Sequence, residues 1–243
     1  MKKYVSVLEL FIRSSFYKAL LIFVGMAAIE LCGFWYVFQM SLQKKEHMGL
    51  EMIIDATAIS GIFKIGFLVL TASLVFSGYS SGCNQNYTLK RLQIKEWNIA
   101  LLQCFYNGMC YFLFWTVQVV LLFIMSSFYS ENALEVTNQT VMLAFYRNDF
   151  MHSMFPMEAS VRWIENGIML IGCAVTATSF SGQLRKGRFD ISLVIVVAIC
   201  MVAMVGGLGN HAYIGLVFAI LVWIAIGFYW MFKKEYEDER RKK

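Results

Sequence analysis

The chain has 243 residues, of which 59% are hydrophobic and only 15% are charged. A soluble globular protein carries about 25% charged residues, and a disordered chain lacks the aromatic residues that make up 16% of this one. The composition excludes both classes and indicates an integral membrane protein. The net charge of +5 requires no nucleic-acid partner, because the cytoplasmic loops of membrane proteins collect Lys and Arg.

Residues 2–18 are too polar to cross a membrane, but their apolar residues recur at helical spacing. The apolar set consists of Tyr4, Val7, Leu8, Phe11 and Ile12. The charged residues that lie apart from it are Lys2, Lys3, Glu9 and Arg13. The pattern predicts an amphipathic helix that lies in the inner membrane interface before the first span. The alternative is a short basic tail that only fixes the topology.

Six segments are long and apolar enough to cross a bilayer, which needs about 20 such residues. We therefore expect an all-α integral membrane protein with one transmembrane domain over residues 1–243. The first segment begins too deep in the chain for a signal peptide, and we expect it to be retained. The predicted spans are residues 19–41, 56–78, 99–126, 161–181, 190–208 and 212–232.

Two charged residues, Glu30 and Lys64, fall well inside the first and second predicted spans. Each costs about 2.5–3.5 kcal/mol on insertion scales unless it is paired or hydrated. Counted from the inner ends of the spans, their depths differ by about 4–5 Å. We predict that Glu30 and Lys64 pair and hold the two spans in register, or that they face a shared polar cavity. A substrate or proton role is the functional alternative.

The connection after the second span, residues 79–98, is longer than a simple turn needs to be. It has a polar start, a short helical stretch with Lys90, Arg91 and Lys95, and apolar residues that could anchor it. This composition predicts a segment that docks on a cytoplasmic partner.

Polar and aromatic residues within the third span predict contacts between helices. Gln103 and Asn107 lie one turn apart on one face, which favours hydrogen bonds to a neighbouring helix over a ligand site. Trp115 falls in mid-span and is expected to pack between helices. Residues 127–160 then form the one sizeable outer region, which we interpret as an extracellular loop: either a cap of short helices over an exit pathway or a loop resting on the membrane.

The distribution of cationic residues predicts the orientation of the chain. Sixteen Lys and Arg residues fall on the side of the N-terminus and only three on the other side. By the positive-inside rule, both termini are cytoplasmic.

No metal-binding motif is present in the sequence: the three histidines are not clustered, the six cysteines have no CxxC spacing, and HExxH does not occur. GxSxG occurs once, at residues 78–82, but it lies where an apolar predicted span ends and not at the strand-to-helix turn that a serine nucleophile requires. We therefore expect no catalytic residue and no metal site, and a membrane enzyme acting on lipids has no acid, base or metal candidate. GxxxxGK[ST] is also absent, so an ATP-driven activity would need an ATPase on another chain.

Gly82 and the stretch YTLKRLQIKEWNI at residues 87–99 resemble the permease subunits of bacterial ABC-2 type exporters. Members of that family commonly read TL-x-RLP-[IV]-S-R-x-x-I at this point, followed by their third span. Gln93, Lys95 and Glu96 depart from the pattern, replacing a proline, a small hydroxyl residue and a basic residue. The residues that match are Thr88, Leu89, Arg91, Leu92, Ile94 and Ile99.

The resemblance implies a half-transporter of the bacterial cytoplasmic membrane that forms a homodimer and binds two copies of an ABC ATPase subunit. ATP and Mg²⁺ would bind the ATPase, and this chain would hold no cofactor. Residues 83–97 would be the coupling helix that enters a cleft of the ATPase. The implied cargo is an amphipathic peptide, such as a toxin or an antimicrobial peptide, or another hydrophobic molecule. The implied coupling residues are Thr88, Leu89, Lys90, Arg91, Leu92, Ile94 and Lys95.

A second class of function stays open. An immunity or sensory membrane protein could sequester a peptide without ATP, and it would need no partner surface in residues 79–98. An ATPase that accompanies the solubilised chain would distinguish the exporter from this alternative.

Overall fold

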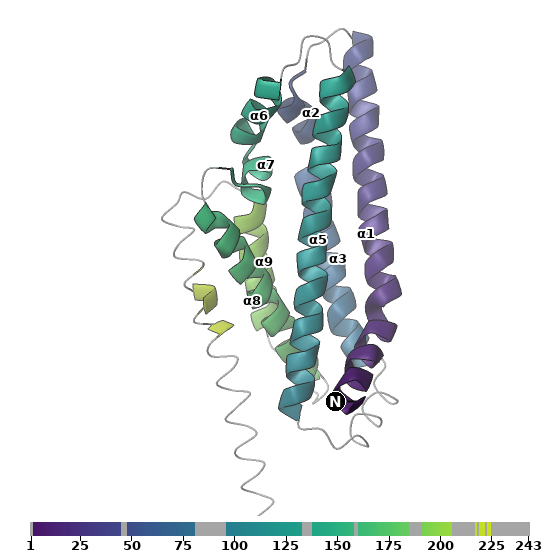
Figure 1. The fold of residues 1–243 in the computed structure, drawn as a ribbon, viewed down its shortest axis with the longest axis vertical. Helices are drawn as coiled ribbons and strands as arrows, with labels where there is room; N and C mark the ends of the chain where they lie inside the picture. The colour runs from purple at the N-terminus through teal and green to yellow at the C-terminus, as the bar shows by residue number, and fades with distance from the viewer. Residues whose placement is uncertain are drawn as a thin grey trace, which may run out of the picture.

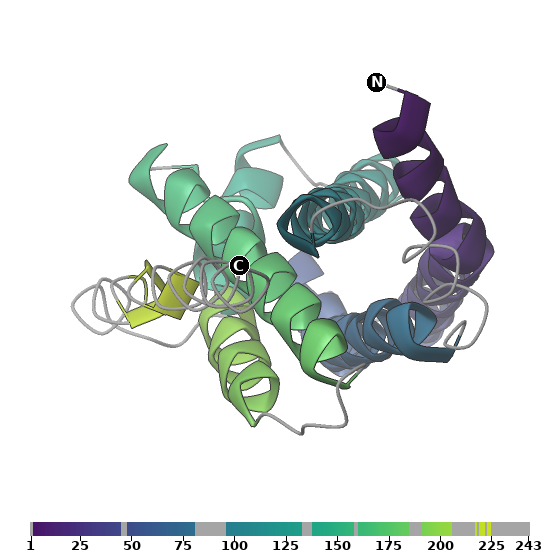
Figure 2. The same cartoon turned by 90° about the horizontal axis from the view of Figure 1, so that it is seen from below.

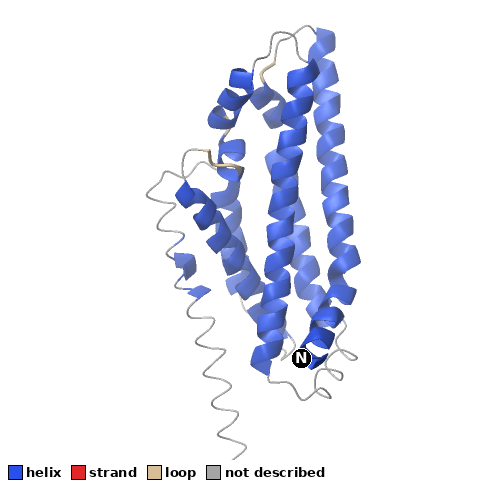
Figure 3. Cartoon of the chain, in the orientation of Figure 1, coloured by secondary structure: helices blue, strands red, loops and turns tan. Residues whose placement is uncertain are grey.

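The computed structural model describes residues 2–44, 48–80, 96–132, 138–157, 160–184 and 191–205, together with 217, 219–221 and 223–224. All regular secondary structure in these residues is helical (Figure 3). The helices are α1 (Lys2–Lys44), α2 (Leu50–Ala56), α3 (Ile59–Ser80), α5 (Glu96–Asn132), α6 (Asn138–Arg147), α7 (Asp149–Met154), α8 (Ser160–Leu184) and α9 (Ser192–Val205).

The long helices α1, α3 and α5 run side by side, and α1 lies along one edge of the bundle, where it contacts both α3 and α5 (Figures 1 and 2). Helix α8 packs across α5 and α3, and α9 packs against α8. The short helices α2 and α6 lie at the end of the bundle away from the N-terminus, with α7 beneath them (Figure 1). The two ends of the bundle therefore differ, with short helices covering one of them.

Four helices are long and apolar enough to cross a membrane: Tyr4–Gln43, Ile59–Ser77, Trp97–Asn132 and Val161–Leu184. They correspond to the first four predicted spans and indicate a multi-pass membrane protein. The predicted fifth span contains α9, which has 14 described residues, shorter than the bilayer requires. Most of the predicted sixth span lies outside the described residues.

Apolar side chains cover the outside of the bundle, while many polar side chains lie within it. Leu21 is 72% exposed and Val24 is 60% exposed, whereas Thr71, Gln103 and Asn107 are at most 4% exposed. In a soluble protein large apolar patches are buried. The reversed arrangement is the one expected of helices solvated by lipid, which pair their polar side chains with one another.

The predicted boundary between an interfacial helix and the first span is not found. Residues 2–18 and the first span form one continuous helix, α1. Val7, Phe11 and Ser15 are buried, and Ser15 Oγ donates a hydrogen bond of 2.8 Å to Tyr106 Oη of α5. Val7 and Phe11 of the predicted apolar stripe therefore face the bundle, whereas Tyr4 and Ile12 of the same stripe are exposed.

Most of the described residues between 127 and 160 lie in helices. Helix α5 continues to Asn132, six residues beyond the predicted end of the third span, and α6 and α7 follow. Asn148 joins this region to α2: its Oδ1 accepts a 3.0 Å bond from the N–H of Met151, and its Nδ2 donates a 2.8 Å bond to Asp55 Oδ1. The short helices agree with one of the two predicted alternatives, but a cap over an exit pathway stays a prediction, and α2 is an unpredicted addition to these helices.

The predicted helix–helix hydrogen bonds of the third span are confirmed. Gln103 Nε2 donates to Ser181 Oγ, and Asn107 Nδ2 donates to Thr178 Oγ1, both at 3.1 Å. These bonds tie α5 to α8. Trp115 also packs between helices as predicted, since it is 6% exposed and its ring centroid lies 5.2 Å from that of Trp163.

Candidate intramembrane polar site

Glu30 lies in α1 at the point where α1, α3 and α5 meet. One turn earlier, Met26 approaches α3 so closely that a Cβ added to Gly66 would lie 3.3 Å from its Sδ and 3.2 Å from Phe114 Cζ of α5. Glu30 is on the same face of α1 as Met26, and its side chain is fully buried. Helix packing therefore places a carboxyl group in the centre of three helices.

Aromatic rings pack along α1 both before and after Glu30. On one side, the ring centroid of Phe23 lies 5.8 Å from that of Phe114, which in turn lies 5.2 Å from Phe63 of α3. On the other side, Phe34 and Phe128 pack edge to face at 6.5 Å. These rings separate the carboxyl group from water and leave it in a medium of low polarity.

Gln118 of α5 is the hydrogen-bond partner of Glu30. Its Nε2 donates to Glu30 Oε2 at 3.0 Å, and its side chain is also fully buried. The second oxygen of each side chain, Glu30 Oε1 and Gln118 Oε1, is buried and has no hydrogen-bond partner. The site thus has one satisfied hydrogen bond and two buried acceptor atoms without a donor.

The predicted ion pair between Glu30 and Lys64 is not formed within the described residues; Glu30 bonds to Gln118 instead. Gly66 packs against Met26, which places Lys64 and Glu30 in neighbouring parts of α3 and α1. The side chain of Lys64 lies on a different face of α3 from the core residues. Phe63 and Phe67 face the core, whereas Lys64 lies about 100° around the helix from Phe63 and is half-buried.

Gln118 was not among the predicted site residues. Its signal is the register of α5, where Asn107, Tyr111 and Gln118 follow one another at spacings of four and seven residues and so lie on nearly one face. Asn107 and Tyr111 bond to neutral hydroxyl groups, Thr178 on α8 and Thr71 on α3. Gln118 continues this face and bonds to the ionisable Glu30.

The predicted coupling residues lie outside the described residues. Only the ends of the helices that flank them are placed, Ser80 of α3 and Glu96 of α5. The residues concerned are Thr88, Leu89, Lys90, Arg91, Leu92, Ile94 and Lys95.

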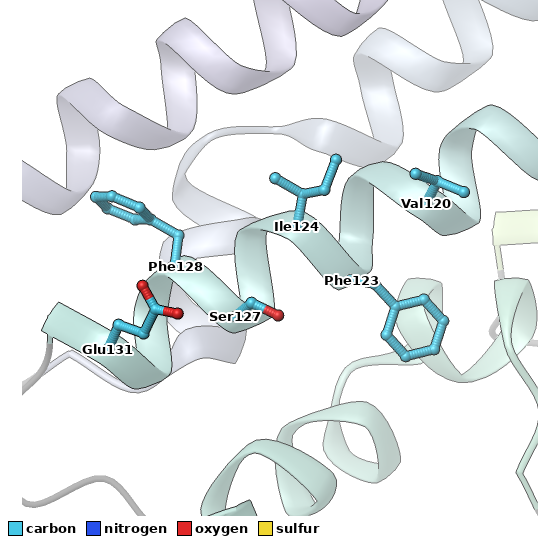
Figure 4. Close-up of a pocket in the computed structure, with 6 residues that line it drawn as sticks. All are labelled: Val120, Phe123, Ile124, Ser127, Phe128 and Glu131. Atoms are coloured by element: carbon cyan, nitrogen blue, oxygen red, sulfur yellow. The ribbon is translucent and has the colours of Figure 1, made fainter.

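A surface groove of about 430 Å³ runs along the C-terminal third of α5, and all of its lining residues belong to that helix (Figure 4). The lining is apolar apart from Ser127 and Glu131. Neither Glu30 nor Gln118 contributes to it, so the groove is separate from the buried polar site. Its lining residues are Val120, Phe123, Ile124, Ser127, Phe128 and Glu131.

Within the described part of the chain, no three His, Cys, Asp or Glu side chains come together in a way that could hold a metal ion. Cys173 and Cys200 are free thiols with their sulfur atoms 3.2 Å apart, buried between α8 and α9. Burial makes a thiol inert, so this pair is a packing contact.

Comparison with known protein families, curated proteins and solved structures finds no match to this chain.

Proposed function

We propose that the chain is the transmembrane permease subunit of an ATP-driven, ABC-2 type exporter in the bacterial cytoplasmic membrane. The observation that carries the proposal is the resemblance of residues 87–99 to the segment that follows the second span in that family. The bundle of long apolar helices supports a membrane subunit. The absence of GxxxxGK[ST] from the sequence assigns ATP binding to a separate chain.

The arrangement of the helices supports the placement of the coupling residues. Helix α3 ends at Ser80 and α5 begins at Glu96, and both of these ends lie at the end of the bundle where α1 begins (Figures 1 and 2). The fifteen residues between them therefore start and finish at that end, together with the cationic N-terminal residues Lys2 and Lys3. Under the positive-inside rule this is the cytoplasmic end, where a soluble ATPase can bind.

In the proposed mechanism, two permease copies form a homodimer and each binds one ATPase. ATP binding closes the ATPases, and the movement passes through residues 88–95 to α3 and α5. The two bundles then move against each other and expose a cavity lined by apolar and aromatic side chains. Such a lining favours an amphipathic peptide or another hydrophobic molecule as cargo.

The proposal is tested by purifying the tagged chain in detergent from its native membrane and measuring ATP hydrolysis and co-purified chains. We expect an ATPase with a GxxxxGK[ST] motif, in equal number to the permease. Arg91→Glu or Leu92→Asp should leave insertion intact while abolishing cargo-stimulated ATP hydrolysis. The matched control is Arg185→Glu, which makes the same charge change in another predicted cytoplasmic connection and should leave hydrolysis unchanged.

Full transport by Arg91→Glu, with the ATPase still bound, would contradict the coupling role. Peptide binding and protection of cells by the chain alone, with no ATPase and no ATP requirement, would support the sequestering immunity protein instead.

A further inference from the structure

The buried pair of Glu30 and Gln118 contains an imbalance of donors and acceptors. Gln118 Nε2 donates to Glu30 Oε2 at 3.0 Å. Glu30 Oε1 and Gln118 Oε1 accept no hydrogen bond, although both are buried. If Glu30 is ionised, both remaining atoms are acceptors, and neither can satisfy the other. A buried polar atom without a partner is rare in folded proteins and requires an explanation.

No cation among the described residues compensates a negative charge on Glu30. The titratable groups on the helices that pack against this part of α1 are engaged elsewhere or, like Lys64, form no ion pair or hydrogen bond with Glu30. Glu51 pairs with Arg147, and Asp55 accepts from Asn148. On α5, the hydroxyl groups of Tyr111 and Tyr129 donate to Thr71 and to the carbonyl oxygen of Met48.

One proton accounts for both unsatisfied atoms. Placed on Glu30 Oε1, it creates an O–H donor and removes the charge, and Gln118 Oε1 is the acceptor on the residue already bound. The terminal torsions of Glu and Gln are broad, so a rotation of one group closes a ring of two hydrogen bonds. If the amide nitrogen and oxygen of Gln118 are exchanged, the carboxyl group still has to supply one proton.

Other occupants fit the site less well. Ca²⁺ or Mg²⁺ needs six or more oxygen ligands, whereas this site offers two unsatisfied oxygens. A water molecule could donate to both oxygens, but it would leave the carboxylate charge in the centre of the bundle without a cation, which is costly in a membrane.

We propose that Glu30 is a proton-binding site, in which the protonated carboxyl group and the Gln118 carboxamide form a neutral, doubly hydrogen-bonded link between α1 and α5. Water reaching the α1–α5 contact at this level would hydrate the carboxylate and release the proton, so opening of the contact and release of the proton are coupled. The inference concerns this chain alone and does not depend on an ATPase or on the exporter function.

Infrared spectroscopy of the purified chain in liposomes at neutral pH tests the proposal. We expect a C=O stretching band of a protonated carboxylic acid that is lost in Glu30→Gln and retained in the matched control Glu51→Gln, whose carboxyl group is partly exposed and paired with Arg147. Gln118→Leu should keep the band but shift it, because the hydrogen bonds to the acid are lost. Since Gln118→Leu retains Glu30, the test stands even if Glu30→Gln fails to fold.

Three results would overturn the proposal. One is the absence of a protonated-acid band from the wild-type spectrum, together with the loss of a carboxylate band in the spectrum of Glu30→Gln. Another is a protonated-acid band that Gln118→Leu leaves unshifted. The third is a Glu30 carboxylate band that shifts when Na⁺ is replaced by choline or when Ca²⁺ is added, which would make this a cation site. Each would leave the exporter proposal untouched, because no ATPase is present in the experiment.

Discussion

Gly33 of α1 and Thr57, the C-cap residue of α2, lie in direct contact: a Cβ added to the glycine would be 2.8 Å from Thr57 Cγ2. Thr57 cannot easily turn aside, because it is β-branched and its Oγ1 donates a 2.7 Å bond to the carbonyl oxygen of Ile53. The contact fixes α1 against the start of α3, one turn beyond Glu30. Glycine is required here by space and not by backbone conformation.

Gly33→Ala should therefore destabilise the protein. Overpacking typically costs about 1–3 kcal/mol, and alanine's better helix propensity offsets up to about 1 kcal/mol of it, so we expect a net loss of up to about 2 kcal/mol in denaturant unfolding in detergent. Gly25→Ala is the matched control in the same helix, where an added Cβ meets nothing within 4 Å. Equal stability of the two variants would contradict the close contact.

The hydrogen bond from Asn107 to Thr178 should contribute measurably to the packing of α5 on α8. Replacing Asn107 by Leu removes the donor from a buried interface, and interhelical bonds of this kind average about 0.6 kcal/mol, with a maximum near 1.7. A double-mutant cycle with Thr178→Val measures the coupling free energy directly. Thr116→Val is the control, because that hydroxyl group is exposed and bonds only within its own helix. A coupling energy of zero would count against the α5–α8 register.

Asn148 should be the residue that holds the short helices α2 and α7 together. Asn148→Ala removes the N-cap of α7, which is worth about 1 kcal/mol, and also the bond to Asp55. We expect faster proteolysis or hydrogen exchange within residues 138–157 than in the long helices. Arg147→Ala is the neighbouring control: its ion pair with Glu51 is exposed, and such pairs contribute about 0–1 kcal/mol. The same protection in both variants would show that Asn148 is not a link.

Much of the membrane architecture could be predicted from the sequence, because long apolar segments leave few alternatives to helices that cross a bilayer. The contacts of Gln103 and Asn107 were predictable for a related reason: amide groups in a span need partners on other helices. The extent of α1 was not predictable. The spacing of Val7, Phe11 and Ser15 shows a face that is distinct, but it does not show whether lipid or another helix covers it.

The polar site was predicted only in part. Counting residues along a span gives depth, and on that measure Glu30 and Lys64 agree. Whether two side chains face each other depends also on the rotation of each helix about its axis, which is set by packing. In α3 the large rings of Phe63 and Phe67 occupy the core, and they turn Lys64 away from Glu30. Gln118 could not be predicted, because a glutamine on a polar helix face is common in sequence. What distinguishes it is its hydrogen bond to Glu30, which only the structure shows.

The orientation of Lys64 gives a prediction that separates the observed arrangement from the ion pair. If Lys64 paired with Glu30 inside the bundle, Lys64→Met would leave a buried charge uncompensated and cost about 3–5 kcal/mol. In the structure Glu30 bonds to Gln118 and Lys64 is half-buried, so removal of the ammonium group from a membrane span should leave stability unchanged or raise it by up to about 2 kcal/mol. The free energies of unfolding of Lys64→Met, Glu30→Gln and the double variant decide the question. Additivity within about 0.5 kcal/mol is expected for groups that do not interact, whereas a larger coupling energy would restore the pair.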